Sequence, residues 1–313
     1  MTKIEDWIGT SETDDSLDLT RIRGSLSPKA GELLALLERS DIEPLFEERA
    51  AASREAAAAQ RRFRRLSAVA VLAGAGAALS SGALLACTSG DGAALPATCA
   101  GGVSQAVLSS QVLSLFAATA ATAVLAGGSL AERWSTARRG AEALRREIFT
   151  VLVDRARTAP PSALRQVLEF FRRYQLELQI RYYTTSKTRH AIRAGRILWA
   201  TAIIAGLSAV AGTLGGLEGP WRTVSAFLGL LVPVLLAAAN SWQTTHLDQE
   251  KSEAYGTARS KLAALQRQLD TVRAAADAGD AAVVADYVRQ VHLAMESEGA
   301  SWKAAADTAP TAT

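Results

Sequence analysis

Long stretches without charge alternate with strongly charged stretches along this chain. The four uncharged stretches are residues 66–90, 92–131, 197–217 and 223–247. A bilayer core of about 30 Å is crossed by roughly 20 apolar helical residues. Because backbone groups in lipid must bond within their own segment, such a stretch predicts a helix. The sequence therefore predicts an all-α chain with four transmembrane helices in two hairpins, and the best windows are Leu66–Ala86, Val107–Gly127, Ile197–Leu217 and Thr223–Ala239.

The charged stretches carry a second pattern, in which apolar residues recur at alternating spacings of three and four. This spacing aligns side chains along one seam of a helix, as in a coiled coil. We expect the seams to lie on long extensions of the spans and to pack into one cytoplasmic helical bundle, or else against a neighbouring subunit. The seam residues are Trp134, Ala137, Ala141, Leu144, Ile148 and Val151, then Leu164, Leu168, Phe171, Gln175, Leu178 and Tyr182, and then Tyr255, Ala258, Leu262, Leu265, Leu269 and Val272. In the second of these seams, Gln175 is the one polar member.

One structural plan occurs twice along the chain: a cytoplasmic helix, a span, a short loop, a span and a second cytoplasmic helix. Prolines 160 and 161 must interrupt a helix, so we place the boundary between two parallel repeats there, as residues 28–158 and 159–303. Residues 1–27 are acidic and poor in apolar periodicity, which predicts disorder. We expect a loose tail at residues 304–313, after an amphipathic helix from Ala281 to Glu296.

Basic residues lie on one side of all four predicted spans. They are Arg61, Arg62, Arg64 and Arg65, then Arg133, Arg138, Arg139, Arg145 and Arg146, then Arg181, Lys187, Arg189, Arg193 and Arg196, and then Lys251, Arg259 and Lys261. The two hairpin loops contain a single basic residue, Arg222. The positive-inside rule therefore predicts a multi-pass protein of the cell's inner membrane with both termini cytoplasmic. The acidic start does not resemble a signal peptide, so we expect the first span to direct insertion.

The net charge of +3 resides in these flanks. Orientation in the membrane explains them better than recognition of anionic lipid or of nucleic acid, and we expect no nucleic-acid partner. Small residues recur at four-residue spacing within the spans, which favours close helix packing, although spans so rich in Ala, Gly and Ser produce such rows by chance. The packing candidates are Gly74, Ala78, Gly82, Gly212, Gly216 and Gly229.

No charged residue lies inside any predicted span, which argues against pumps and ion-coupled carriers. Gln105, Gln111 and Asn240 are candidates for a polar pore lining, or else they bond within the bundle. The three histidines are far apart and lack metal-ligand spacing, and no catalytic constellation or phosphate-binding loop is present. The sequence therefore predicts neither an enzyme nor a cofactor or metal site.

The two cysteines, Cys87 and Cys99, both fall in the first hairpin loop on the predicted outer side. Exported cysteines commonly pair in an oxidising compartment. We therefore expect a disulfide between them rather than two reduced thiols at the bilayer edge.

Several short motifs resemble one family of bacterial proteins. They are Arg181-Tyr182-Tyr183, the basic helix through Lys187, Arg189, His190 and Arg196, the segment Glu298 to Trp302, and in the first half Glu132-Arg133-Trp134 and residues 141–147. These segments resemble the SLATT family, the two-transmembrane effector domains associated with SMODS nucleotidyltransferases and SLOG sensors, here as a tandem pair over residues 40–303.

The resemblance implies a membrane-embedded effector of a bacterial conflict or defence system that forms pores or perturbs the lipid bilayer when triggered. Our first hypothesis adds that this effector is a homo-oligomer. No sensor domain is visible in the sequence, so the resemblance leaves the sensing to a separate cytoplasmic protein. Two other functions remain open from the residues alone, namely a constitutive ion channel and a non-conducting membrane scaffold that recruits partners.

Overall fold

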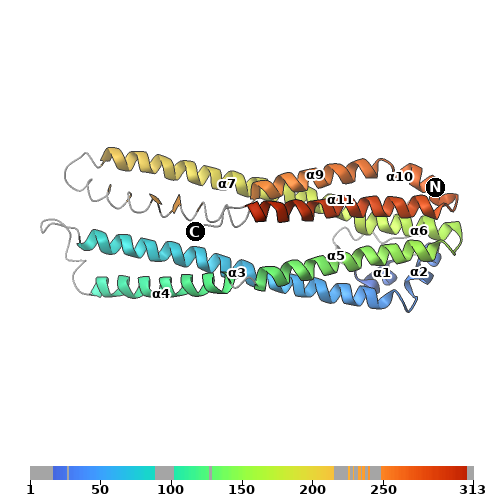
Figure 1. The fold of residues 1–313 in the computed structure, drawn as a ribbon, viewed down its shortest axis with the longest axis horizontal. Coiled ribbons are helices and arrows are strands. Elements are labelled where there is room, and N and C mark those ends of the chain that lie inside the picture. Colours follow the sequence, from blue (N-terminus) through green and yellow to red (C-terminus); the bar gives the residue numbers. More distant parts are fainter. Residues whose placement is uncertain are drawn as a thin grey trace. The chain divides into compact units, whose positions relative to one another are not determined.

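The computed structural model describes residues 17–26, 28–88, 102–126, 129–214 and 248–308, with single positions between 225 and 239. Within these ranges the fold is all-α and contains no strand, which confirms the predicted class. The elements are α1 Leu19–Ser25, the 3-10 helix η2 Pro28–Ala30, α2 Gly31–Leu37, α3 Glu43–Thr88, α4 Gly102–Ala126, α5 Ser129–Ala156, α6 Pro161–Phe171, the π-helical turn η4 Arg172–Glu177, α7 Leu178–Leu214, α9 Asp248–Gln266, α10 Leu269–Asp277 and α11 Ala281–Thr308 (Figure 1).

The helices belong to two compact units. The first, which we call the helical bundle, comprises Met1–Ala58, Trp134–His190 and Gln249–Thr313. The second, which we call the apolar unit, comprises Ala59–Arg133 and Ala191–Asp248. The unit boundaries fall inside α3, α5, α7 and α9, and α3 and α7 continue without interruption from one unit into the other.

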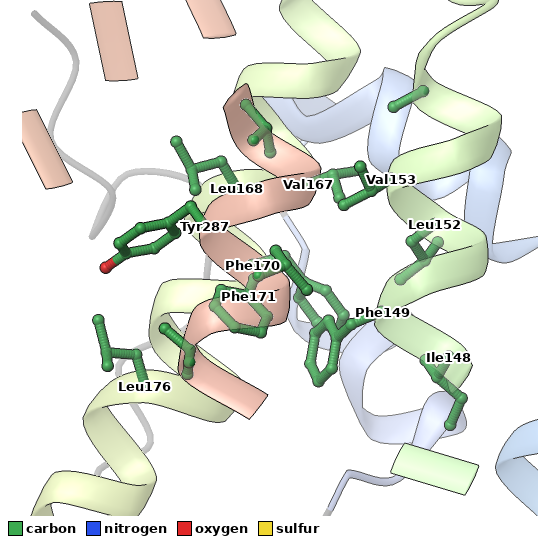
Figure 2. Close-up of a cluster of buried hydrophobic side chains, with 14 of the residues drawn as sticks. Ile148, Phe149, Leu152, Val153, Val167, Leu168, Phe170, Phe171, Leu176 and Tyr287 are labelled. Carbon is green, nitrogen blue, oxygen red and sulfur yellow. The ribbon is translucent and has the colours of Figure 1, made fainter. Parts of the chain in front are cut away.

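The core of the bundle is built from aromatic and branched side chains of α1, α2, α5, α6, α9, α10 and α11. Phe149 of α5 meets Phe171 of α6 edge to face, with ring centroids 5.1 Å apart, and Tyr287 of α11 lies 6.4 Å from Phe171 (Figure 2). Aromatic pairs in this arrangement gain about 0.5–1.5 kcal/mol beyond their buried area. Ile148, Leu168, Leu262 and Leu269 are buried in the same cluster, and Leu265 packs against it partly buried.

The seam of α6 and α7 shifts by one residue relative to the sequence pattern. The regular spacing predicts that Tyr182 faces the core, but Tyr182 is 41% exposed and its neighbour Tyr183 is 2% exposed. The cause is the π-helical turn between Arg172 and Glu177. A π turn holds more residues than an α turn, so every residue that follows it is rotated around the helix.

In the described residues, the structure differs from the expectation at both chain ends. Within the segment expected to be disordered, α1 is a helix whose first turn is capped by Asp18, and Leu17 and Ile22 are buried. Apolar residues three positions apart, Leu19 and Ile22, are buried on one face of this helix, and their burial stabilises it despite the acidic composition of the segment. At the other end, α11 continues to Thr308 instead of becoming loose at residue 304. The alanines at 304–306 have the highest helix propensity of any residue type.

The helix breaks have local causes. α5 ends before Pro160 and Pro161, which confirms the break predicted at residues 159–161. α10 ends before Gly279, which adopts a φ of +80° that side chains other than glycine rarely tolerate. The next residue, Asp280, accepts the backbone N–H groups of Ala282 and Val283 through its carboxylate and so caps α11.

The apolar unit exposes large hydrophobic side chains along its helices. Leu72 of α3, Phe116 of α4 and Trp199 of α7 are each at least 72% exposed. The helical run Pro161–Val210 is long and apolar enough to cross a membrane, and only 6% of its most apolar window is buried. A helix in the core of a soluble protein is mostly buried, so this exposure favours a lipid-facing surface.

Other spans are covered less fully by the structure. Among the residues that it describes, Pro161–Val210 is the one helix that meets the length and hydropathy of a span, and Val107–Ala121 is a shorter apolar segment. The window Leu66–Ala86 lies within α3, and Val107–Gly127 lies within α4 except for Gly127, which is outside the described residues. Most of the fourth window, Thr223–Ala239, lies outside the described residues.

Candidate functional site

The π-helical turn between α6 and α7 is the most unusual feature of the bundle. Within it, the backbone carbonyl of Tyr174 accepts a hydrogen bond of 2.6 Å from the Arg145 guanidinium of α5. Arg145 is buried, so the bond is formed away from water, where it is strongest. π turns inside α-helices occur frequently at functional sites. This turn joins the bundle helix α6 to α7, the helix that continues into the apolar unit.

A buried glutamine occupies the centre of the turn. Gln175 is fully buried, and its side-chain amide N–H donates to the Met295 sulfur of α11 over 3.1 Å. Its Oε1 is also buried and has no hydrogen-bond partner among the described residues. A buried acceptor without a partner costs about 1–3 kcal/mol. The bundle therefore contains an unsatisfied buried acceptor at the point where α6 passes into α7.

His292 of α11 lies one helical turn before Met295 and faces the same region. Its ring lies 5.6 Å from the Phe171 ring, and its Nε2 is buried without a hydrogen-bond partner in the described part of the chain. Burial, together with the positive charges of Arg146 and Arg145, lowers the pKa of His292 to about 4. The imidazole is thus held neutral inside the bundle.

Acid should destabilise the bundle through this histidine. Its folded pKa of about 4 lies below the ordinary value of 6.5, so the unfolded chain binds the proton more readily. The contribution of neutral His292 to the free energy of unfolding is fully present above pH 6.5. It is lost as the pH falls toward 4, by about 3 kcal/mol in total. We expect His292→Gln to flatten the fall in melting temperature between pH 6.5 and 4, measured by circular dichroism.

A suitable control for that experiment is His190→Gln, because His190 packs against Tyr255 with ring centroids 5.6 Å apart and is not fully buried. The control variant should keep the acid sensitivity of the unchanged protein. Equal pH profiles for His292→Gln and the unchanged protein would show that His292 does not control acid stability.

A second polar cluster joins α6 to α10. The Glu169 carboxylate is buried, and it accepts hydrogen bonds from Arg273 at 2.6 and 3.1 Å and from Arg172 at 2.7 Å, with Arg165 at 3.3 Å. Burial opposes the ionisation of Glu169, but the arginines outweigh it and hold the pKa of the carboxyl below its ordinary value. The cluster lies next to the π turn, because Arg172 is the first residue of that turn.

Aromatic residues join α7 to α9. The Tyr255 ring lies 5.7 Å from Tyr183 and 5.8 Å from Tyr182, and the Tyr182 and Tyr255 hydroxyls are 3.4 Å apart. Arg138 of α5 donates to the Tyr182 hydroxyl over 3.4 Å. Three helices of the bundle therefore meet at the motif Arg181-Tyr182-Tyr183.

The structure brings some predicted seam residues together and leaves others aside. Phe171, Leu168, Ile148, Leu262, Leu269 and Tyr255 share the bundle core, Leu178 is buried at its edge, and Leu144 and Trp134 are half-buried. The sequence did not single out Glu169, Arg273 or His292. The polar residue Gln175 within an apolar seam was the one signal that pointed to this region.

The packing and pore candidates lie in the apolar unit. A Cβ on Gly74 would meet no described atom within 4 Å, whereas one on Gly76 would lie 3.3 Å from the Ser114 hydroxyl. The close approach of α3 to α4 is therefore at Gly76. Ala78 and Gly82 lie in α3, Gly212 in α7, and Gly216 and Gly229 lie outside the described residues.

The remaining candidates are only partly covered by the structure. Gln105 and Gln111 lie in α4, where Gln111 is half-buried, and Asn240 lies outside the described residues. Cys87 lies in the last turn of α3, and Cys99 is outside the described residues, so the disulfide stays a prediction. In the described part of the chain, no group of three His, Cys, Asp or Glu residues could hold a metal ion.

One family model matches the chain. It is described as SMODS and SLOG-associating 2TM effector domain 1, and it covers residues 171–302. No curated protein and no solved structure matches the chain. The match begins at Phe171 and contains the π turn, the aromatic motif and the third and fourth predicted spans. The match places a SLATT domain at residues 171–302, and it favours a membrane protein of the effector type found in conflict systems.

Proposed function

We propose that this protein is a four-span effector of the inner membrane that assembles as a homo-oligomer and permeabilises the bilayer when triggered. The observation that carries the proposal is the SLATT match over a helix that exposes its apolar side chains. The absence of charge from all four windows supports assembly of several copies, since one set of spans so poor in polar groups cannot readily enclose a wide aqueous pore. The proposal assigns no catalytic step to the chain.

The proposal places the trigger at the helical bundle. The predicted outer loops are too short to house a sensor, so a separate cytoplasmic protein would act on the bundle. α3 and α7 are continuous helices that belong to both units. A continuous helix with a rise of about 1.5 Å per residue transmits tilt or rotation without a flexible joint. The π turn, with its unsatisfied Gln175 oxygen, is the element that we expect to repack on activation.

The function is tested by leakage from cells. We expect bacteria that express the full chain with its neighbouring genes to lose potassium and admit an impermeant dye once the system is triggered. A constitutive channel would leak without any trigger. Insertion into the membrane without leakage under any condition would contradict the proposal and favour the scaffold function.

The topology can be tested separately. The arginine flanks predict that a reporter fused after Thr313 reads cytoplasmic and that one inserted at residue 220 reads external. The two reporters serve as controls for each other. An external reading at Thr313 would overturn the orientation and, with it, the cytoplasmic position of the bundle.

The outer-loop cysteines provide a further prediction. If the first hairpin loop lies in an oxidising compartment, Cys87 and Cys99 should form a disulfide. Alkylation of the isolated membrane protein should then label neither thiol until a reductant is added, and Cys99→Ser should free Cys87 for labelling. Complete labelling of both thiols without reductant would show that the bond does not form.

A further inference from the structure

The described arginines of the apolar unit have no partner within the described part of the protein. In the bundle, some exposed arginines are paired with carboxylates, as Arg155 is with Asp41 at 2.6 Å and Arg157 with Asp154 at 3.3 Å. Others, such as Arg54 and Arg267, are likewise exposed without a partner among the described residues. In the apolar unit, seven described arginines form no hydrogen bond or ion pair with any described residue. They are Arg61, Arg62, Arg64 and Arg65 of α3, Arg133 of α5, and Arg193 and Arg196 of α7.

These unpaired arginines lie beside the uncharged runs. Arg65 directly precedes the run of α3, Arg196 directly precedes that of α7, and Arg133 follows the run of α4 after Glu132. All except the half-buried Arg193 are exposed. At 3.6 residues per turn, the four arginines of α3 cover an arc of about 160° around that helix. Such an arc offers guanidinium groups to several surrounding molecules at the level where the apolar surface begins.

We propose that these arginines, in addition to setting the orientation, bind the headgroups of anionic phospholipids, so that the protein selects an anionic lipid shell. The charge is complementary, and the arginines continue an exposed apolar surface that lipid tails can cover. A guanidinium donates two parallel hydrogen bonds to a phosphate, whereas a lysine ammonium acts as a point charge. All seven residues are arginine, and the apolar unit contains no lysine.

The inference rests on the proposed membrane insertion, and the experiment separates the two. The full chain is reconstituted into phosphatidylcholine vesicles, and resistance to carbonate extraction measures its insertion. Spin-labelled phosphatidylglycerol and spin-labelled phosphatidylcholine are then compared for immobilisation next to the protein. We expect phosphatidylglycerol to be preferred by about fivefold or more, and the preference to fall as salt is raised.

Variants distinguish headgroup binding from orientation. R61K/R62K/R64K/R65K keeps the positive charge that sets orientation but removes the bidentate groups, so it should insert normally and lose at least half of the preference. R193Q/R196Q should lose part of it. The control R157Q/R289Q alters exposed bundle arginines that are paired with Asp154 and Asp286, and it should bind lipid unchanged.

Three results would overturn the inference. The first is normal insertion with equal immobilisation of the two lipids. The second is a preference that neither the lysine nor the glutamine variant reduces. The third is complete loss of the preference when inorganic phosphate replaces chloride at equal ionic strength, which would show sites for free anions. Failure to insert would instead contradict the proposed membrane function.

Discussion

Replacing Glu169 with glutamine should lower the free energy of unfolding of the bundle by about 3 kcal/mol, the usual cost of removing one partner from a buried ion pair. The Glu169 side chain is 6% exposed and accepts hydrogen bonds from Arg273 and Arg172. In the variant the guanidinium groups remain close together without the charge that holds them. Thermal unfolding in detergent should therefore show a melting temperature lower by about 10 °C.

The same network provides the control. Asp270 pairs with Arg273 at 2.8 Å, but its side chain is 89% exposed. Exposed ion pairs contribute about 0–1 kcal/mol, so Asp270→Asn should lower the melting temperature by only a few degrees. Similar effects for the two variants would mean that Glu169 behaves as a surface residue and that the α6–α10 contact is stabilised by its apolar side chains alone.

The class of the fold was predictable because its signals are local. A charge-free run long enough to span lipid and a seam of alternating spacing are both visible within single stretches of sequence. Pro160 and Pro161 likewise fix a break through their own backbone geometry. The helical state of the long elements α3, α5 and α7 depends on signals of this kind.

The features that surround the candidate site were not predictable, because they depend on contacts between distant residues. Glu169 meets Arg273 across 104 positions, and Gln175 meets Met295 across 120. A helical wheel assumes a constant number of residues per turn, so one π turn was enough to exchange Tyr182 for Tyr183 in the core. The N-terminal helix was missed because the acidic composition of residues 1–27 predicted disorder. The buried apolar residues Leu17, Leu19 and Ile22 were the local signal for a helix.

Replacing Gln175 with methionine should stabilise the protein and impair its activity. The buried Oε1 has no partner in the described part of the resting bundle, and an apolar side chain of similar length removes that cost. We expect the free energy of unfolding to rise by about 1 kcal/mol. A repacked state in which the amide oxygen gains a partner is favoured by about 1–3 kcal/mol, and methionine removes this bias.

The consequence for activation follows from the populations of the two states. A change of about 1.4 kcal/mol in the free-energy difference between the resting and the repacked state alters their population ratio tenfold. Triggered leakage per inserted copy should therefore fall about tenfold in Gln175→Met. The matched control is Leu176→Met in the same turn, which is equally buried but apolar before and after. Volume-conserving exchanges usually cost less than about 1.5 kcal/mol, so this control should leak as the unchanged protein does. If Gln175→Met instead melts earlier and leaks normally, the glutamine is a structural element of the resting bundle and the π turn does not participate in activation.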